Sequence, residues 1–377
     1  MITLWTGSRW CCCILLLFFA LPAYTQTNIT GRVVDEKDNT PLAGASVYFN
    51  NTTISTYTTV DGDFHFEGIR MLNTEIVIYV SGYEVLVYKP TPKQIEGKRI
   101  VFKLQAKDLN AVTKLPLKGT ERRIFLGMFR QFFLGVTEEA NTCEIVNEKS
   151  IYITQAESDG SFHICADTAL VIINSWLGYK IIYNLEEFWY DYATGKPHFS
   201  GYARYEELGS ATKWIKHRDK AYHGSTLHFY RSLVNHQLYE QGFEIFLMKP
   251  LPDTTDLTLQ PHFMITPGGC VVKAEPLSAE NILFIDSTNE ISIKLADELW
   301  VQYNKNPVSK YFLIAHGLLD NLGIKGVEST IQFKKSPVGI NYNGVLDDYT
   351  NIEYTGYWIY EKLANTLPLN YQPFNSR

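Results

Sequence analysis

The sequence predicts a mainly β protein, in which an N-terminal β-sandwich precedes a larger β-rich α+β domain. Short runs with apolar residues at every second position recur along the chain, and turn residues separate them. Aromatic residues make up 14% of the chain, with 24 Tyr and 21 Phe, as suits half-buried β-surfaces. A hydrophobic content of 45% is ordinary for a globular protein, and 377 residues allow about two domains.

Residues 1–25 are predicted to be a signal peptide. Arg9 supplies a positive charge, the run from Cys11 to Ala20 is apolar, and the small residue Ala23 follows. The apolar run is too short to span a bilayer, which requires about 20 residues. Cleavage after Ala23 and cleavage after Thr25 fit equally well. We therefore expect an exported chain with no transmembrane helix after cleavage.

Residues 27–105 are predicted to form the β-sandwich. Ile29, Gly31 and Val33 alternate with polar residues, which indicates a strand with one buried face. Asp61-Gly62 between two alternating runs predicts a tight hairpin, because Gly accepts the positive φ of such a turn. Short strands at this density are typical of a sandwich. The predicted strands cover residues 29–33, 45–49, 56–60, 64–67, 75–80, 84–88 and 99–104.

Four segments within this region resemble the carboxypeptidase-like regulatory domain, which has a transthyretin-like β-sandwich fold. In order, they are Ile29-Thr30-Gly31-Arg32-Val33-Val34-Asp35, Pro41-Leu42-Ala43-Gly44-Ala45-Ser46-Val47, Thr59-Val60-Asp61-Gly62-Asp63-Phe64 and Ser81-Gly82-Tyr83. The resemblance implies a fold and a setting in the Gram-negative cell envelope. It implies no reaction, because this domain carries no catalytic residues. A zinc carboxypeptidase would need a His-x-x-Glu motif, and no His in the chain precedes Glu at that spacing.

Residues 106–120 are predicted to be a linker and residues 121–377 a β-rich domain with a few helices. Apolar residues three and four apart predict an amphipathic helix over residues 121–133. A second helix is expected from Ser225, a good N-cap, to Gln241. Gly356-Tyr357-Trp358 and Leu367-Pro368 add to a resemblance to envelope proteins with an uncharacterised β-rich domain, for which no activity is known.

Several kinds of site are not expected. A net charge of −6 argues against a nucleic-acid partner. The three cysteines after the signal peptide, Cys143, Cys165 and Cys270, have no Cys-x-x-Cys spacing, so a zinc ribbon is excluded. Four histidines lie within twenty residues, but their spacing favours hydrogen-bonded or surface side chains over metal ligands. These four histidines are His217, His223, His228 and His236. We expect no cofactor and no metal.

Six residues are candidates for a ligand surface. Trp176, Trp189 and Trp214 are predicted to form an exposed aromatic surface. Arg218, His228 and Arg231 could form an anion-binding patch beside a helix N-terminus. The simpler interpretation pairs these cations with carboxylates of the same chain, such as Glu186 or Glu187.

The pattern as a whole predicts a non-enzymatic protein of the periplasm or outer membrane that binds or assembles with other envelope proteins or with glycan. The alternative is a hydrolase acting on glycans or peptides. Glu186, Glu187 and Asp191 lie among aromatic residues, as acids in a glycosidase site do. Convergence of Glu186, Asp191 and His228 in one cleft would favour the hydrolase, and their separation would favour the binding protein.

Overall fold

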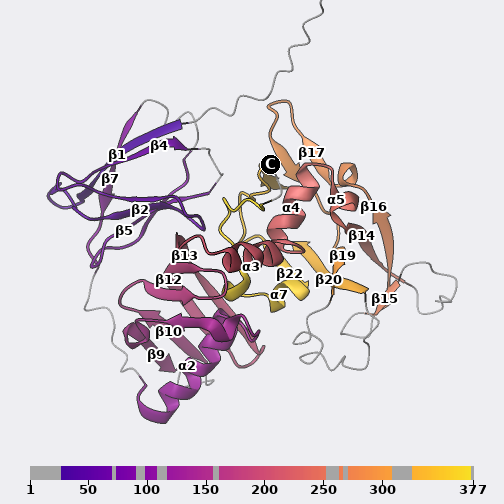
Figure 1. Cartoon of the computed structure of the whole chain (residues 1–377), viewed down its shortest axis with the longest axis horizontal. Coiled ribbons are helices and arrows are strands. Elements are labelled where there is room, and N and C mark those ends of the chain that lie inside the picture. The colour runs from indigo at the N-terminus through magenta and orange to yellow at the C-terminus, as the bar shows by residue number, and fades with distance from the viewer. Residues whose placement is uncertain are drawn as a thin grey trace, which may run out of the picture.

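The computed structural model describes residues 27–69, 74–90, 98–107, 117–155, 161–251, 263–265, 271–307 and 325–374 (Figure 1). The chain is mainly β with few helices, as the sequence predicts. The expected signal peptide and Cys270 lie outside the described residues. Within them, no helix is both long and apolar enough to cross a bilayer.

The N-terminal region forms two sheets that pack face to face. Their strand orders are β4-β1-β7 and β3-β2-β5-β6. Buried side chains that include Ile29, Val47 and Phe49 fill the space between them. Gly62 has a φ of +75° in a tight turn before β4, so a turn is found at Asp61-Gly62. The expected hairpin is wrong, because the flanking strands β3 and β4 belong to different sheets. The strands are β1 (Thr27–Asp35), β2 (Ser46–Phe49), β3 (Ser55–Tyr57), β4 (Asp63–Ile69), β5 (Ile76–Tyr79), β6 (Leu86–Tyr88) and β7 (Arg99–Leu104).

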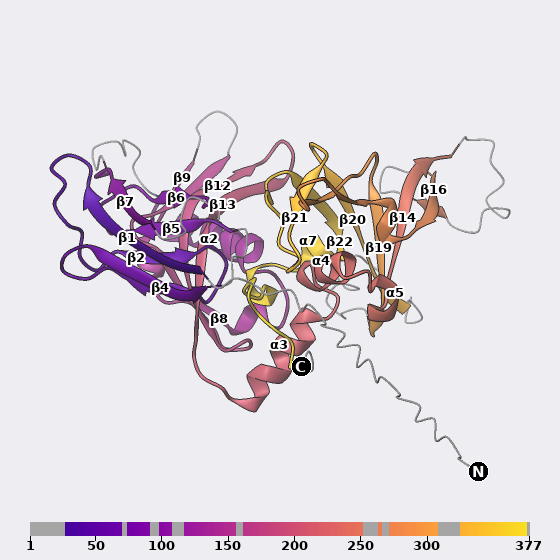
Figure 2. The ribbon, with the colours of Figure 1, turned by 90° about the horizontal axis from the view of Figure 1, so that it is seen from above.

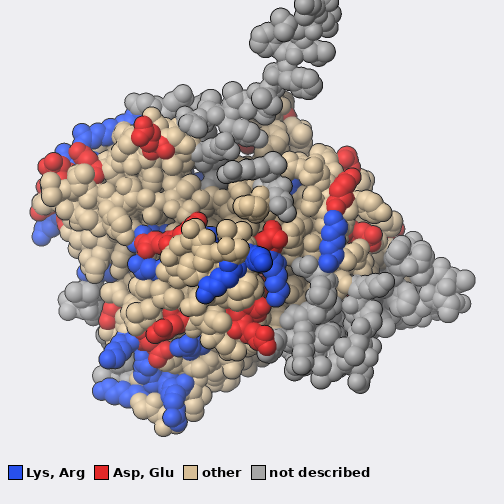
Figure 3. All heavy atoms as spheres, in the orientation of Figure 1, with Lys and Arg blue, Asp and Glu red and all other residues tan. Residues whose placement is uncertain are grey.

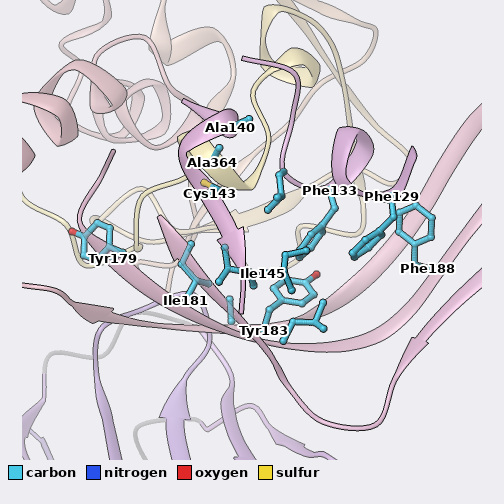
Figure 4. Packing of buried hydrophobic residues seen from close by; sticks show 14 of the residues in the cluster. Phe129, Phe133, Ala140, Cys143, Ile145, Tyr179, Ile181, Tyr183, Phe188 and Ala364 are labelled. Atoms are coloured by element: carbon cyan, nitrogen blue, oxygen red, sulfur yellow. The ribbon is translucent and has the colours of Figure 1, made fainter. Parts of the chain in front are cut away.

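A second β unit, a single sheet here called the middle sheet, follows. Its order is β8-β11-β12-β10-β9, and β13 pairs with β12. Helix α2 (Gly119–Phe133) confirms the expected amphipathic helix and packs against one face of this sheet. Figure 4 shows Phe129 and Phe133 of α2 pointing toward Tyr183 and Phe188. The strands are β8 (Cys143–Ile145), β9 (Ile151–Gln155), β10 (Phe162–Ala166), β11 (Leu170–Asn174), β12 (Tyr179–Asp191) and β13 (Lys196–Glu207).

A third group of strands, here called the C-terminal sheets, has a hydrophobic core separate from that of the middle sheet. Figure 2 shows the two groups side by side. The orders are β15-β16-β14-β19-β20-β22 and β17-β18-β21. The strands are β14 (Phe243–Pro250), β15 (Phe263–Ile265), β16 (Val271–Leu277), β17 (Leu283–Ile285), β18 (Ile291–Ile293), β19 (Leu299–Pro307), β20 (Lys325–Phe333), β21 (Val338–Ile340) and β22 (Ile352–Gly356).

The helices between the middle and C-terminal sheets differ in part from the expectation. Ser225 caps α4 (Thr226–Val234), as predicted, and accepts a hydrogen bond from the His228 amide. The expected single helix to Gln241 is wrong, because His236 has a φ of 55° and separates α4 from α5 (Leu238–Gln241). Helix α3 (Thr212–Tyr222) was not expected, since its sequence is largely polar.

The turn after β2 joins the sandwich to β13, the edge strand of the middle sheet. The Asn51 amide donates to the Ala203 carbonyl at 2.7 Å, and the Tyr205 amide donates to the Thr52 carbonyl at 2.9 Å. The side-chain oxygen of Asn50 accepts from the Ala203 amide at 3.0 Å. Backbone groups of an edge strand need such partners when they are buried. The joint is therefore a short β-type pairing.

The C-terminal segment, residues 361–374, contacts all three β units. Figure 1 shows it in yellow between the sandwich and the C-terminal sheets. The Leu369 amide donates to the Asn51 carbonyl at 2.7 Å, and Asn370 exchanges two hydrogen bonds with Thr53. Near its start, the Ala364 carbonyl accepts from the side chain of Asn174 at 2.9 Å. This segment therefore helps to fix the relative positions of the units.

Replacing Asn50 with Ala should lower the free energy of unfolding by about 1–3 kcal/mol, because the buried amide of Ala203 loses its acceptor. The change also removes a bond of 3.2 Å from Asn50 to Glu75. The measurement is urea unfolding followed by circular dichroism. Asn141→Ala, at an exposed position, is the control. Equal stability of the two variants would contradict a structural role for the joint.

Candidate functional site

Two of the predicted tryptophans are associated with α3: Trp214 lies in its first turn and Trp176 beside it. The ring of Trp176 stacks on His217 with centroids 4.6 Å apart, and the indole of Trp214 donates to the Ser175 carbonyl at 2.9 Å. Gly178 has a φ of +70°, and a Cβ there would lie 2.2 Å from Trp214. Both rings are half-buried. They therefore serve in part to hold α3 on the middle sheet.

The third tryptophan lies elsewhere, on the hairpin of β12 and β13. Trp189 stacks on His198 with ring centroids 4.1 Å apart and an interplanar angle of 9°. His163 of β10 lies opposite Trp189 in the strand register, so the three residues form a row across three strands. Both histidines are exposed. The predicted aromatic surface is thus divided between α3 and this row.

Arg218 on α3 is almost fully buried, at 6% exposure. Its guanidinium donates to the Leu177 and Gly178 carbonyls at 2.8 and 3.0 Å. One terminal nitrogen lies 3.2 Å from a carboxylate oxygen of Glu207, and the group lies 3.9 Å from the centre of the Tyr179 ring. Arg218 therefore pairs with an internal carboxylate, as the simpler interpretation expected, but that carboxylate is Glu207 and neither Glu186 nor Glu187.

Arg231 on α4 is bound to three backbone carbonyls and is 9% exposed. Its donors reach Asn343 at 3.1 Å, Tyr371 at 2.7 Å and Leu369 at 2.9 Å. Two of these acceptors belong to the C-terminal segment. A guanidinium has five N–H donors in a fixed planar arrangement, which suits simultaneous contact with several carbonyls. Arg231 therefore anchors the C-terminal segment to α4.

His228, also on α4, is buried and neutral. Its Nδ1 accepts from the Gly224 amide at 3.1 Å, so Nε2 carries the proton and donates to the side-chain oxygen of Gln241 at 3.1 Å. Burial lowers the pKa of the imidazole to about 4, and the positive charges of Lys305 and Arg231 act in the same direction. His228 is thus a neutral hydrogen-bonding group at physiological pH.

Arg218, His228 and Arg231 lie around two tyrosines that the sequence did not single out as site residues. Tyr222 contacts His228 and Tyr371 with ring centroids 4.8 and 5.8 Å apart. A cavity of about 240 Å³ is lined by Arg218 and Tyr371, and another of about 420 Å³ by His228 and Arg231. Gln372 lines both cavities. The sequence offered no local signal for this cluster, because Tyr222 and Tyr371 are 149 residues apart and meet only in the fold.

The larger cavity also contains groups capable of proton transfer. Asp219 lies 3.6 Å from Nε2 of His223, and the rings of His223 and His228 are 5.1 Å apart. Within the described ranges, no three His, Cys, Asp or Glu residues are placed to hold a metal ion. The cavity is therefore a polar recess lined by side-chain amides, two imidazoles, one carboxylate and the guanidinium of Arg231.

The acids considered for hydrolysis have other surroundings. Asp191 accepts hydrogen bonds from Thr194 and from the Ala193 amide at the end of β12, which lower the pKa of its carboxyl. Glu186 lies at an irregularity of the β12–β13 pairing, where burial raises the pKa of its carboxyl. His228 shares no hydrogen-bond partner with either acid. The convergence required for the hydrolase hypothesis is not found among these residues.

The charged surface is mixed. Figure 3 shows acidic and basic side chains interspersed over one face of the molecule, including neighbouring red and blue patches near its centre. Among the described residues, this face therefore carries no continuous basic patch of the kind that binds a nucleic-acid backbone.

Comparison with known proteins identifies the N-terminal region. Residues 29–113 match the CarboxypepD_reg-like domain. The match supports the carboxypeptidase-like regulatory domain, and the rest of the chain is unassigned. No curated protein matches the chain.

One solved structure similar to this chain is that of a Bacteroides fragilis protein described as membrane-associated and of unknown function. The two sequences are 6% identical, and the match covers 84% of this chain and 91% of that chain. The TM-score is 0.18, which does not define a common fold.

Replacing Arg231 with Met should lower the free energy of unfolding by about 3 kcal/mol or more, because buried carbonyls lose charged donors. The C-terminal segment should then be cleaved faster by protease, which mass spectrometry of the fragments measures. Arg123→Met, at an exposed position of α2, is the control. Equal cleavage of the two variants would show that Arg231 does not anchor the segment.

His228 should make stability depend on pH. Its folded-state pKa of about 4 lies below the ordinary 6.5, so only the unfolded chain binds a proton there as pH falls from about 6.5 toward 4. Stability present at pH 7.5 should therefore decrease by about 2 kcal/mol at pH 5 on account of this residue. His228→Gln should remove that part of the pH dependence in urea unfolding. The exposed control His65→Gln should retain it.

Proposed function

We propose that the chain is an exported, non-enzymatic protein of the Gram-negative envelope that works by binding or assembly in the periplasm or at the outer membrane. The observation that carries this proposal is the use of Arg218, Arg231 and His228 within the chain itself. Their donors bind carbonyls and an amide of the same protein, and those of Arg231 hold the C-terminal segment that contacts all three β units. Such an arrangement suits a rigid scaffold that presents surfaces to partners.

The proposed organisation follows from the sequence. A signal peptide of residues 1–25 would direct export, and residues 27–105 would be the regulatory-like sandwich. A linker of residues 106–120 would lead to the β-rich remainder, residues 121–377. The CarboxypepD_reg-like match supports the second of these parts.

The row formed by His163, Trp189 and His198 is the proposed contact surface. On β12 and β13, the sandwich covers the part of this sheet face near Asn184 and Arg204, which bond to Tyr48 and Tyr57. The row lies further along the same face, where the residues are half-buried or exposed. Flat stacked rings suit contact with a protein or with a sugar ring, because aromatic faces contribute large apolar area with little loss of side-chain entropy.

The test combines fractionation of the producing cells with purification of the tagged chain and its partners. We expect a chain shortened at the signal peptide, found in the periplasmic or outer-membrane fraction together with an envelope protein or glycan. Trp189→Ala should reduce partner recovery by roughly tenfold, the size of a central aromatic contact. Tyr239→Ala, at a residue with 79% exposure on α5, should have no effect.

Retention of the uncleaved chain in the cytoplasm would overturn the proposed location. Recovery without a partner, or with one unaffected by Trp189→Ala, would overturn the proposed surface. Turnover of glycan or peptide substrates by the purified chain would favour the hydrolase instead.

A further inference from the structure

A third cavity lies at the junction of the β units, apart from the two described above. It measures about 310 Å³ and is bounded by the turn after β2, the start of α4 and the C-terminal segment. A cavity of this size falls within the range of small-molecule sites. Its lining residues are Asn51, Ser225, Thr226, Leu227, Tyr230, Tyr349, Trp358, Glu361, Asn365, Thr366, Leu367 and Leu369.

The acidic group of this cavity is Glu361, which follows α7 (Tyr357–Tyr360). No Lys, Arg or His is among the lining residues. Within the described part of the chain, the Glu361 carboxyl has no hydrogen-bond or ion-pair partner. The first side-chain carbons of the adjacent Lys362 pack against Gly135. The cavity therefore contains an acid without a counterion.

The groups around Glu361 do not supply a positive charge either. Burial and the negative charge of Glu139 raise the pKa of its carboxyl to about 8. Glu139 itself lies 3.5 Å from Nζ of Lys220. The other titratable groups facing the site are the phenols of Tyr230, Tyr349 and Tyr357, which are neutral at physiological pH. Without a bound cation, the Glu361 carboxyl is therefore mostly protonated at pH 7.

Aromatic side chains complete the walls. The indole N–H of Trp358 donates to the Gly224 carbonyl at 2.8 Å, and the Tyr230 hydroxyl lies 3.0 Å from that of Tyr354. These bonds hold both side chains in place. The hydroxyl of Tyr349 accepts from the Leu346 amide at 3.4 Å. Aromatic rings attract organic cations, most strongly where water is excluded.

We propose that this cavity binds a small organic cation, an alkylammonium whose charge is neutralised by Glu361 and whose chain lies among the aromatic and leucine side chains. Ser225, Thr226 and Asn365 add oxygen atoms that can accept N–H bonds. The site is independent of the proposed envelope function, because it requires neither a particular location nor a protein partner.

Binding of a cation must release a proton, since Glu361 is protonated in the empty site at pH 7 and ionised when paired. The affinity should therefore rise roughly tenfold between pH 6 and pH 7, as expected for a carboxyl that titrates near pH 8. A neutral ligand held by the protonated carboxyl would show the opposite dependence. The direction of the pH effect distinguishes the two.

The test is titration calorimetry of the full chain with butylammonium chloride at pH 6, 7 and 8. The uncharged analogue 1-pentanol, of similar size, controls for apolar burial. Measurements in two buffers with different ionisation enthalpies give the number of protons released, expected to be close to one at pH 7. We expect butylammonium to bind at least roughly tenfold more tightly than 1-pentanol at pH 8, as a charge-neutralising contact requires.

Two variants complete the experiment. Glu361→Gln keeps the shape of the side chain and should weaken butylammonium binding by roughly tenfold or more and abolish proton release, with unchanged circular dichroism. Glu353→Gln, at an exposed glutamate 3.7 Å from Lys334, should leave both unchanged. Absence of butylammonium binding, equal binding by Glu361→Gln, or an affinity that falls with rising pH would each overturn the proposal.

Discussion

The attachment of the C-terminal segment to Arg231 is the constraint on which the arrangement of the three β units depends. The buried guanidinium holds the Leu369 and Tyr371 carbonyls, and Leu369 in turn donates to Asn51 in the sandwich. A buried cation is costly unless its donors are used, so these contacts are coupled. Chain segments more than 300 residues apart meet in this way, as Thr53 and Asn370 show.

The middle sheet receives the sandwich on one face and α2 on the other. This follows from alternation along β12 and β13, where Tyr183 points to the core of α2 and Asn184 to Tyr48 of the sandwich. Arg218 adds a second buried cation, which joins α3 to the turn before β12. Polar contacts thus attach the sandwich, whose apolar cluster is its own. The apolar cluster of the middle sheet, in contrast, also includes Ala364, Leu367 and Leu369 of the C-terminal segment.

The sequence predicted the features that depend on local pattern. Period-two alternation and the Asp-Gly turn gave the sandwich, the spacing of phenylalanines gave α2, and the cap at Ser225 gave the start of α4. Features set by tertiary contact were missed. Helix α3 has a polar sequence and is held by Trp214 and Arg218, and α4 ends where His236 adopts a left-handed conformation. Propensity carries little information about such contacts.

The same distinction explains why the candidate site was only partly predictable. Residue type drew attention to Arg218, His228 and Arg231 as a possible ligand surface, whereas the structure shows their side chains bonded within the chain. The partners are mostly backbone carbonyls, which no residue pattern reveals. Nothing in the sequence pointed to Glu361, because a single glutamate becomes distinctive only through the residues that surround it in the fold. Its cavity borders the segment that Arg231 anchors, so any group bound there contacts the same joint that orders the three units.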